Sequence, residues 1–186
     1  AADRAIAFAD GKRVLTAMDR ELLERHEIEL QAAGNIRLDI LMENMGRVNY
    51  GPMINWQRKG IDGCVMINDR FVQHGWLQYS LPLDNLDKLD YTRGYEKGMP
   101  AFYRFVFTVK KIGDTFLDCE GWGKGCAFVN GFHLGRFWEV GPQKRLYLPG
   151  ALLKEGENEI ILFETEGKCK ESISLQAEPD LGRRPL

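Results

Sequence analysis

The chain has 186 residues, a net charge of −2, an apolar fraction of 44% and a charged fraction of 28%. This length and composition fit one or two domains with packed cores. Acidic and basic residues are mixed along the chain, so we expect neither nucleic acid nor an anionic membrane as a partner. No apolar run reaches the ~18 residues that a membrane span needs.

The first predicted element is a β-hairpin at residues 4–17. Two apolar strands flank Asp10-Gly11, a pair that favours a tight turn because both central residues need positive φ. Residues 37–44 then alternate polar and apolar side chains, as a half-buried strand does. Residues 27–30 are expected to form a strand that runs into a turn, whereas helix and strand both stay open for residues 21–24.

The second half of the chain predicts the same device. A hairpin is expected at 125–138 around Asn130-Gly131, and one helical turn at 151–154. The further strands are expected at residues 63–67, 102–109, 115–119, 145–148, 158–165 and 172–175. Many short strands with almost no helix favour an all-β protein of antiparallel β-sandwiches.

A repeat relates the two halves of the chain. Residues 6–11 (IAFADG) and 126–131 (CAFVNG) share an offset of 120, and Ile40 and Ile160 fit the same offset without a gap. Such a repeat indicates a duplicated unit. Residues 101–125 precede the second copy, and the first copy would need their equivalents before Ala1. We therefore expect the chain to be part of a larger protein.

The residues that commonly carry catalysis or bind metals show no known arrangement. The three histidines are far apart, and no two of the four cysteines have the two-residue spacing of a zinc or redox site. Cys64 and Cys126 lie in apolar runs, so we expect buried thiols rather than disulfides. Trp122 and Trp138 are also expected in the core. We expect no metal and no cofactor; the compartment stays open, with the cytoplasm slightly favoured.

The most distinctive loop follows the strand at 37–44. Two glycines bracket Arg47, Asn49 and Tyr50, which supply a planar cation, an amide and an aromatic ring. Such a trio suits a sugar, because a ring packs on its C–H face while amide and guanidinium groups bond its hydroxyls. The competing interpretation is a structural turn with a tucked Tyr50, which these residues alone favour.

Six motifs occur in order along the chain: residues 43–51 (ENMGRVNYG), 59–60 (KG), 100–103 (PAFY), 121–125 (GWGKG), 129–138 (VNGFHLGRFW) and 141–143 (GPQ). Together they resemble the carboxy-terminal region of family 35 glycoside hydrolases, the β-galactosidases. The resemblance covers essentially the whole chain. It implies two galactose-binding-like jelly-roll sandwiches that follow a (β/α)8 catalytic barrel.

The resemblance also implies domain boundaries. Residues 1–83 would be a first sandwich that is incomplete at its N-terminus, 84–99 a linker, and 100–186 the second sandwich. The two catalytic glutamates of the family belong to the barrel, so no residue of this chain is assigned a catalytic role, and the chain alone is expected to be inactive. Its expected partners are that barrel and, through it, a β-galactoside; its oligomeric state is not predicted.

In the family, the loop that matches residues 44–51 lies toward the mouth of the barrel. The resemblance therefore makes Tyr50 a substrate-side contact at the rim of the active site, with Arg47 and Asn49 supporting the loop. The alternative is an independent carbohydrate-binding module, and a third possibility is an interface domain without sugar contact. Single aromatic residues at loop tips favour the first interpretation, because a free-standing module needs a cleft of several.

Overall fold

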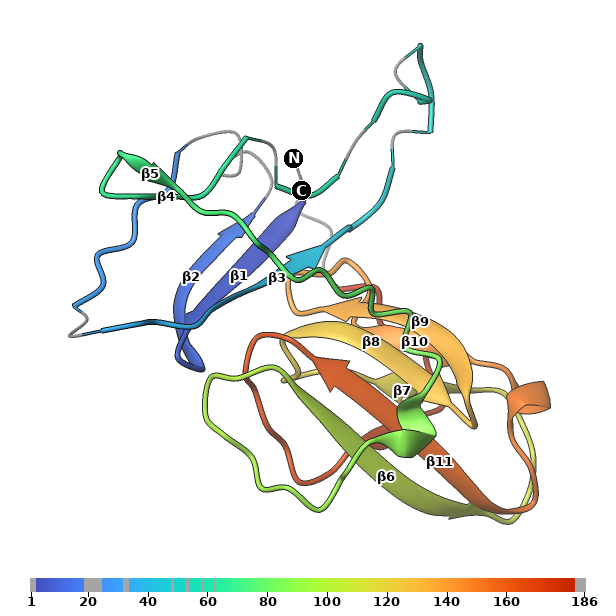
Figure 1. Ribbon diagram of the computed structural model, residues 1–186. Coiled ribbons are helices and arrows are strands. Elements are labelled where there is room, and N and C mark those ends of the chain that lie inside the picture. Colours follow the sequence, from blue (N-terminus) through green and yellow to red (C-terminus); the bar gives the residue numbers. More distant parts are fainter. Residues whose placement is uncertain are drawn as a thin grey trace. The chain divides into compact units, whose positions relative to one another are not determined.

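The computed structural model describes residues 3–18, 25–31, 34–47, 49–52, 54–57, 59–61 and 63–182. Within these residues the chain is almost entirely strand and loop, with two single-turn 3-10 helices, and all its strand ladders are antiparallel (Figure 1). The predicted all-β, antiparallel class is confirmed. The chain divides into two compact units, residues 1–81 and 82–186, which are described separately below.

The first unit is built on a three-stranded sheet in the order β2-β1-β3. β1 (Arg4–Ala9) is its central strand, with β2 (Lys12–Met18) on one side and β3 (Leu38–Glu43) on the other. All six residues of β1 are buried. A separate small hairpin pairs β4 (Met66–Ile67) with β5 (Phe71–Val72).

The second unit is a sandwich of two sheets. One has the order β6-β11-β8-β9, formed by β6 (Ala101–Val109), β11 (Gly156–Glu164), β8 (Lys124–Val129) and β9 (Phe132–Trp138). The other has the order β10-β7-β12, formed by β10 (Arg145–Leu148), β7 (Thr115–Asp118) and β12 (Ser174–Gln176). A 3-10 turn, η3 (Gly150–Leu152), lies where one helical turn was expected.

The core of the second unit lies between its two sheets. Residues from β7, β8, β10 and β11 meet there around Trp122, whose side chain is fully buried between Tyr103 and Phe105. The expectation for Trp122 is confirmed, whereas Trp138 is only half-buried. The buried apolar residues of this core are Leu117, Cys119, Trp122, Ala127, Val129, Phe137, Leu146, Leu148, Leu153, Ile160 and Leu162.

A second apolar cluster covers the outer face of the four-stranded sheet. Leu86, on the 3-10 turn η2 (Leu86–Lys88), packs with Phe128 and Ile161, and Tyr91 donates a hydrogen bond to the Leu86 carbonyl at 2.8 Å. The boundaries expected from the sequence stay a prediction. However, the stretch expected to be a linker, residues 84–99, makes these contacts with the second unit, so that part of it is packed rather than open.

The sequence repeat is reproduced in the backbone of the two hairpins. Arg4 pairs with Met18 in the first and Lys124 with Trp138 in the second, and every later pair matches at the same offset of 120. Both hairpins carry a register shift at the same place, after Ala7 and after Ala127. The turn residues Asp10, Gly11, Asn130 and Gly131 all have positive φ, as the Asp-Gly and Asn-Gly pairs predicted.

The third strand of the repeat is shifted by two residues, so the expected gapless match of Ile40 with Ile160 is wrong. Ala9 pairs with Leu38, whereas its equivalent Val129 pairs with Ile160, an offset of 122. The loops confirm the shift: the amide of Arg37 donates to the Asp10 side chain at 2.9 Å, as that of Glu159 does to Asn130 at 3.0 Å. Two extra residues therefore lie between the second and third strands of the second unit.

Three local predictions differ from the structure. Residues 27–30 form no strand. Their match in the repeat is β10, which pairs with β7. The described residues of the first unit contain no counterpart of β7, so residues 27–30 have no strand to pair with. The strand expected at 63–67 is reduced to β4, and Cys64 is exposed rather than buried. Cys126 is buried as expected, and all four thiols are free. Residues 21–24 lie outside the described residues.

One buried carboxylate fixes the loop that follows β11. The side chain of Glu164 is fully buried and accepts hydrogen bonds from the amides of Glu166 at 3.0 Å, Lys168 at 2.8 Å and, more weakly, Lys124 at 3.4 Å. The same loop is held from outside by Tyr103, which donates to the Lys168 carbonyl at 3.0 Å. Glu164 thus satisfies backbone donors that the end of the strand would leave unpaired.

Glu164→Gln is expected to lower the free energy of unfolding of the second unit by about 1–3 kcal/mol, because the new amide NH2 group faces backbone donors and leaves one of them without an acceptor. Urea denaturation of the wild-type and variant chains measures the loss. Glu159→Gln is the matched control, since Glu159 is partly exposed and pairs with Arg104 at the surface; a loss there of less than about 1 kcal/mol is expected. Equal losses in both variants would contradict the role given to Glu164.

Candidate functional site

The loop after β3 carries all three residues that the sequence singled out. Arg47, Asn49 and Tyr50 are exposed, and the Tyr50 side chain is 91% accessible to solvent. Tyr50 therefore does not pack within the described part of this chain, which removes the tucked-ring interpretation. The structure leaves the role of the three residues at a substrate untested.

The base of this loop is closed by a single carboxylate that precedes β1. Asp3 accepts a hydrogen bond from the Met45 amide at 2.7 Å with one oxygen and from the Lys59 ammonium at 2.5 Å with the other. The side chains of Asp3 and Lys59 are 23% and 16% exposed, so their ion pair is largely shielded from water. Met45 and Lys59 stand at the two ends of the segment that carries Tyr50, and Asp3 joins them.

These contacts also set the charge state of Asp3. Burial raises the pKa of Asp3, but the hydrogen bonds from Lys59 and the Met45 amide together outweigh that effect, so its pKa lies below the ordinary 3.8. The adjacent Arg4 pairs with Glu43 at 3.2 Å and is only 2% exposed, which ties β1 to the end of β3. Two ion pairs side by side therefore anchor the point where the loop leaves the sheet.

We expect the base of the loop to loosen only in acid. A carboxyl group whose pKa is depressed by folding contributes stability that is complete above its unfolded pKa and is lost as pH falls through its folded value. Because the pKa of Asp3 lies below 3.8, the Met45 amide should stay protected at about pH 5 and lose protection as the pH approaches about 2. Hydrogen exchange of Met45, corrected for its intrinsic pH dependence, measures this, and in Asp3→Asn the acid transition should disappear. Persistence of the transition in that variant would assign it to another group.

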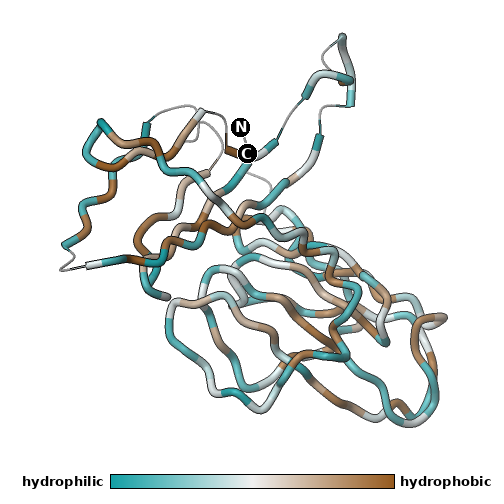
Figure 2. Tube along the Cα trace, viewed as in Figure 1, coloured by the Kyte–Doolittle hydropathy of each residue, from teal (hydrophilic) through white to brown (hydrophobic). Residues whose placement is uncertain are grey.

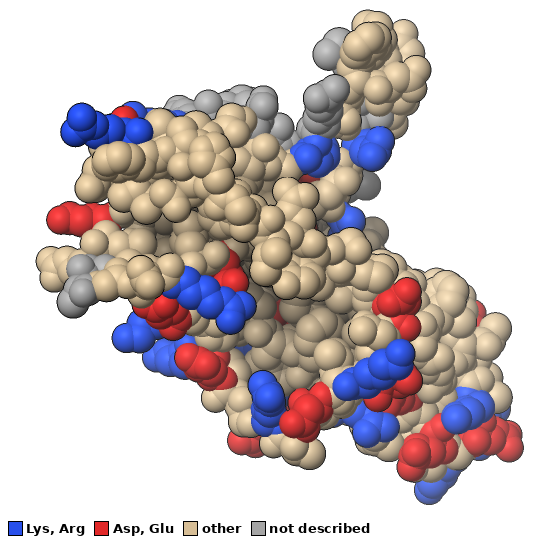
Figure 3. All heavy atoms as spheres, in the orientation of Figure 1, with Lys and Arg blue, Asp and Glu red and all other residues tan. Residues whose placement is uncertain are grey.

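Beyond this loop, the first unit exposes an unusual amount of apolar surface. Figure 2 shows hydrophobic residues along the trace around β4 and β5, and Figure 3 shows mostly uncharged side chains next to the charged group at the tip of this hairpin. The exposed large apolar side chains between residues 50 and 81 are Tyr50, Ile54, Trp56, Ile61, Met66, Ile67, Phe71, Val72, Trp76, Leu77, Tyr79 and Leu81. Several reach high values: Trp56 is 75% exposed, and Leu77 and Tyr79 are 79% exposed.

Sequence reasoning missed this surface. Singly exposed apolar residues are normal on soluble proteins, but a segment this rich in them is typical of an interaction surface. The signal was present in the composition of residues 54–81, where bulky apolar residues recur between polar ones without the period of a strand or helix. The apolar run 64–67 was instead interpreted as a buried strand.

The second unit has a pocket of about 550 Å3 of its own. It is lined by Cys119, Glu120, Gly121, Trp138, Glu139, Gln143, Lys144, Asp180 and Gly182. One face of the Trp138 ring is covered by the Lys124 ammonium, 5.4 Å from the ring centre. The pocket thus combines an aromatic wall with carboxylate, amide and ammonium groups.

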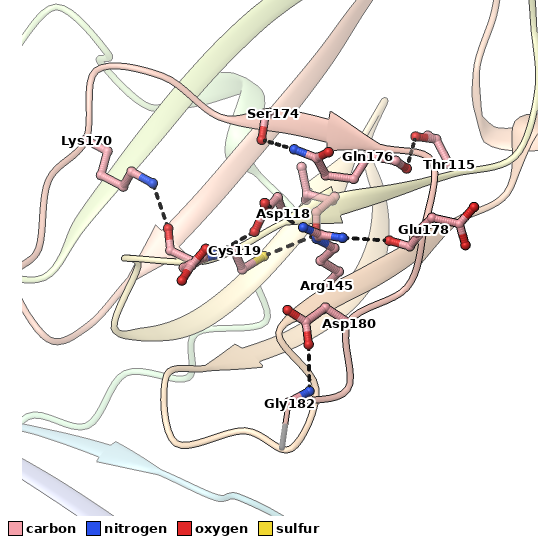
Figure 4. Close-up of polar contacts among 12 residues, drawn as sticks. Thr115, Asp118, Cys119, Arg145, Lys170, Ser174, Gln176, Glu178, Asp180 and Gly182 are labelled. Carbon is pink, nitrogen blue, oxygen red and sulfur yellow. Dashed lines mark hydrogen bonds and ion pairs between the residues drawn. The ribbon is translucent and has the colours of Figure 1, made fainter. Parts of the chain in front are cut away.

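Hydrogen bonds fix the walls of this pocket (Figure 4). Lys170 donates to the Glu120 carbonyl at 2.6 Å, and Asp180 accepts from the Gly182 amide at 2.8 Å. Arg145 pairs with Asp118 at 3.5 Å and donates to the Glu178 carbonyl at 2.9 Å, so the segment after β12 is held against β10. Burial and the neighbouring Asp118 carboxylate raise the pKa of the Cys119 thiol to about 12. This cysteine is therefore a protonated wall residue and no nucleophile.

The described residues contain no group of three or more histidine, cysteine, aspartate or glutamate side chains placed to hold a metal ion. Their helical turns are too short to cross a membrane, and no candidate span is found. The fold and site thus define an all-β protein of two related antiparallel units, with a projecting aromatic loop on the first and a polar pocket on the second.

Comparison with known proteins identifies both units. The family model of the first all-β domain of β-galactosidases matches residues 1–82, and that of the β-galactosidase galactose-binding domain matches residues 100–158. Beta-galactosidase 1 of Dictyostelium discoideum is 42% identical over 141 residues, which cover 71% of this chain and 21% of that protein. Beta-galactosidase 17 of Arabidopsis thaliana is 39% identical over 169 residues, covering 80% and 24%. Human Beta-galactosidase-1-like protein 2 is 42% identical over 154 residues, covering 78% and 24%.

The chain belongs to the β-galactosidase family, as the region that contains these two β-domains. The resemblance expected from the sequence motifs is confirmed. The matched region spans between 21% and 24% of the length of these three relatives.

Proposed function

We propose that this chain is a non-catalytic accessory region of a β-galactosidase, which packs on the catalytic barrel of that enzyme and shapes the rim of its active site. The observation that carries the proposal is the apolar surface of residues 50–81 on a chain that matches about a quarter of each relative. A surface of this kind needs a large partner, and the remaining three quarters of such an enzyme would supply one.

The energetics favour a stable rather than a transient contact. Complete burial of one large apolar side chain stabilises an interface by about 1.5–3 kcal/mol before the entropy cost of ordering is subtracted. With twelve such side chains exposed between residues 50 and 81, burying even half of them would exceed what a passing encounter requires. Permanent interfaces are the more apolar class.

Hydrolysis itself would be performed by the barrel. A retaining glycosidase needs one carboxylic acid to protonate the leaving oxygen and one carboxylate to trap the sugar, with the two groups ~5–5.5 Å apart. In the proposed enzyme, both are glutamates of the barrel. The part of this chain is to complete the site: Tyr50 stacks on the sugar beyond the scissile bond, while Arg47 and Asn49 support the loop and offer donors to sugar hydroxyls.

In the full-length enzyme, Tyr50→Ala should lower kcat/KM for a β-galactosyl disaccharide about tenfold, since a stacked ring contributes on the order of 1 kcal/mol. The loss should be smaller for a small aryl galactoside, which does not fill the position beyond the scissile bond. The melting temperature should stay nearly constant because the ring is 91% exposed. Phe132→Ala, which removes a half-exposed ring from the β8–β9 turn, is the control and should leave both substrates unaffected. Equal losses on both substrates for Tyr50→Ala would contradict the rim contact.

The pocket of the second unit supports a second candidate function, that of an independent carbohydrate-binding module. Its half-buried Trp138 would pack on a sugar face, while Glu120, Gln143 and Asp180 would bond hydroxyls. The pocket offers a single aromatic ring, whereas the first unit exposes twelve large apolar side chains, so the accessory role is the better supported of the two.

If the module function holds, titration of this chain with galactose or lactose should shift the NMR signal of the Trp138 indole N–H at millimolar sugar. Gln143→Ala removes one exposed pocket side chain and should weaken binding several-fold, as loss of one polar contact of about 1 kcal/mol does. Trp76→Ala, outside the pocket, should bind as the wild type does. Unchanged spectra at high sugar concentration would exclude the module function and leave the accessory role standing.

A further inference from the structure

Asp3 bonds both ends of the Tyr50 loop. Its two oxygens accept from the Met45 amide at 2.7 Å and from the Lys59 side chain at 2.5 Å. Between those two residues the described chain has turns but no strand or helix, so no ladder of backbone bonds stiffens it. Tyr50 and Trp56, 91% and 75% exposed, both project from this segment. The direction of these rings therefore depends on how the ends of the loop are held.

The second unit also has a carboxylate near the corresponding end of its central strand. Extending the hairpin offset of 120 by one residue matches Asp3 with Gly123. A Cβ atom at Gly123 would lie 2.5 Å from the Glu166 Cβ and 2.7 Å from Glu164 Oε1, so the space beside Gly123 is filled by the side chains of Glu164 and Glu166. By the strand offset of 122, Glu164 in turn matches Met42. The carboxylate thus comes from the residue before β1 in the first unit and from the last residue of β11 in the second.

Both carboxylates perform the same task. Glu164 accepts from the amides of Glu166 and Lys168 in the loop that follows β11. Asp3 accepts from the amide of Met45, just after β3. The offset of 122 matches Met45 with Gly167, so the bonded amides differ in position between the units. What the two units share is a carboxylate that accepts from amides of the loop after the third strand. What distinguishes the first unit is the added Lys59, which fastens the far end of the loop to the same carboxylate.

We propose that Asp3, with Lys59, is a positioning residue for the active-site rim: their ion pair closes the loop between Met45 and Lys59 and fixes the angle at which Tyr50 meets the sugar. This inference rests on the proposed function of Tyr50. It assigns to a residue at the start of β1 an effect on substrate preference, although Asp3 itself touches no substrate.

The first experiment tests the loop in this chain. Asp3→Asn keeps an acceptor for Met45 but loses the ion pair, Lys59→Met removes only the ammonium group, and Lys59→Arg retains the charge. Hydrogen exchange of the loop amides should become about tenfold faster in Asp3→Asn and Lys59→Met, as loss of a charge-assisted hydrogen bond predicts. It should stay close to wild type in Lys59→Arg. The control Asp39→Asn, which breaks the exposed pair with Arg37 on β3, should leave the loop unchanged.

The second experiment tests positioning in the full-length enzyme. Asp3→Asn should raise KM for the disaccharide several-fold while kcat for a small aryl galactoside stays constant, a split that a general loss of folding would not produce. Combined with Tyr50→Ala, it should cause no further change in the ratio of the two substrates, because both substitutions remove one contact. Lys59→Arg should preserve the ratio.

Each outcome decides between the two proposals. Unchanged exchange in Asp3→Asn would overturn the inference whatever the kinetics. Faster exchange with an unchanged substrate ratio would also overturn it, provided that Tyr50→Ala lowers the ratio. If Tyr50→Ala has no selective effect, the rim function fails and the positioning role falls with it, while faster exchange would still identify the closure of the loop.

Discussion

The two units depend on the same constraint, the complete burial of a central strand. β1 and β8 are each buried along all six residues, and a strand in that position needs hydrogen-bonding neighbours on both edges. The neighbour on one side is the hairpin partner, fixed by an Asp-Gly or Asn-Gly turn and by a register shift at the same residue in both copies. The neighbour on the other side is the third strand, β3 or β11. In the first unit, the loop that carries Tyr50 begins at the end of β3, the third of these strands.

Much of this scaffold could be predicted from local sequence. The hairpins followed from Asp10-Gly11 and Asn130-Gly131, whose turn geometry requires no tertiary information. The third strand was also found, but its register was not, since a shift of two residues preserves the alternation of inward and outward side chains. By the alternation of side chains alone, Ile40 could match either Ile160 or Leu162. Only the observed strand pairing shows that Leu162 is the match.

The remaining features could not be found because they depend on partners distant in sequence. Residues 27–30 resemble β10 but have no counterpart of β7 to pair with among the described residues. Cys64 lies in an apolar run that a local pattern equates with burial, whereas the structure exposes it. For the candidate site, the loop residues Arg47, Asn49 and Tyr50 came from their types and from a resemblance. The closure of that loop by Asp3 and Lys59 joins positions 56 residues apart and leaves no local signal.

The two units obtain this carboxylate from different positions, Asp3 in the first and Glu164 in the second. The first unit thus keeps an acceptor for its loop amide and adds the contact with Lys59. In the second unit the carboxylate comes from the third strand, and glycine at position 123 leaves room for it. In the first unit the carboxylate comes from the residue before the central strand, which frees position 42 for an apolar Met. Glu164 is fully buried beneath its loop, whereas Asp3 stays 23% exposed and can reach a cation at the far end of a longer loop. In both units, amides in the loop after the third strand need an acceptor. The buried Glu164 side chain supplies it in the second unit, and the Asp3 side chain supplies it in the first while also binding Lys59. The Asp3–Lys59 contact lies at the far end of the loop that carries the exposed rings of Tyr50 and Trp56.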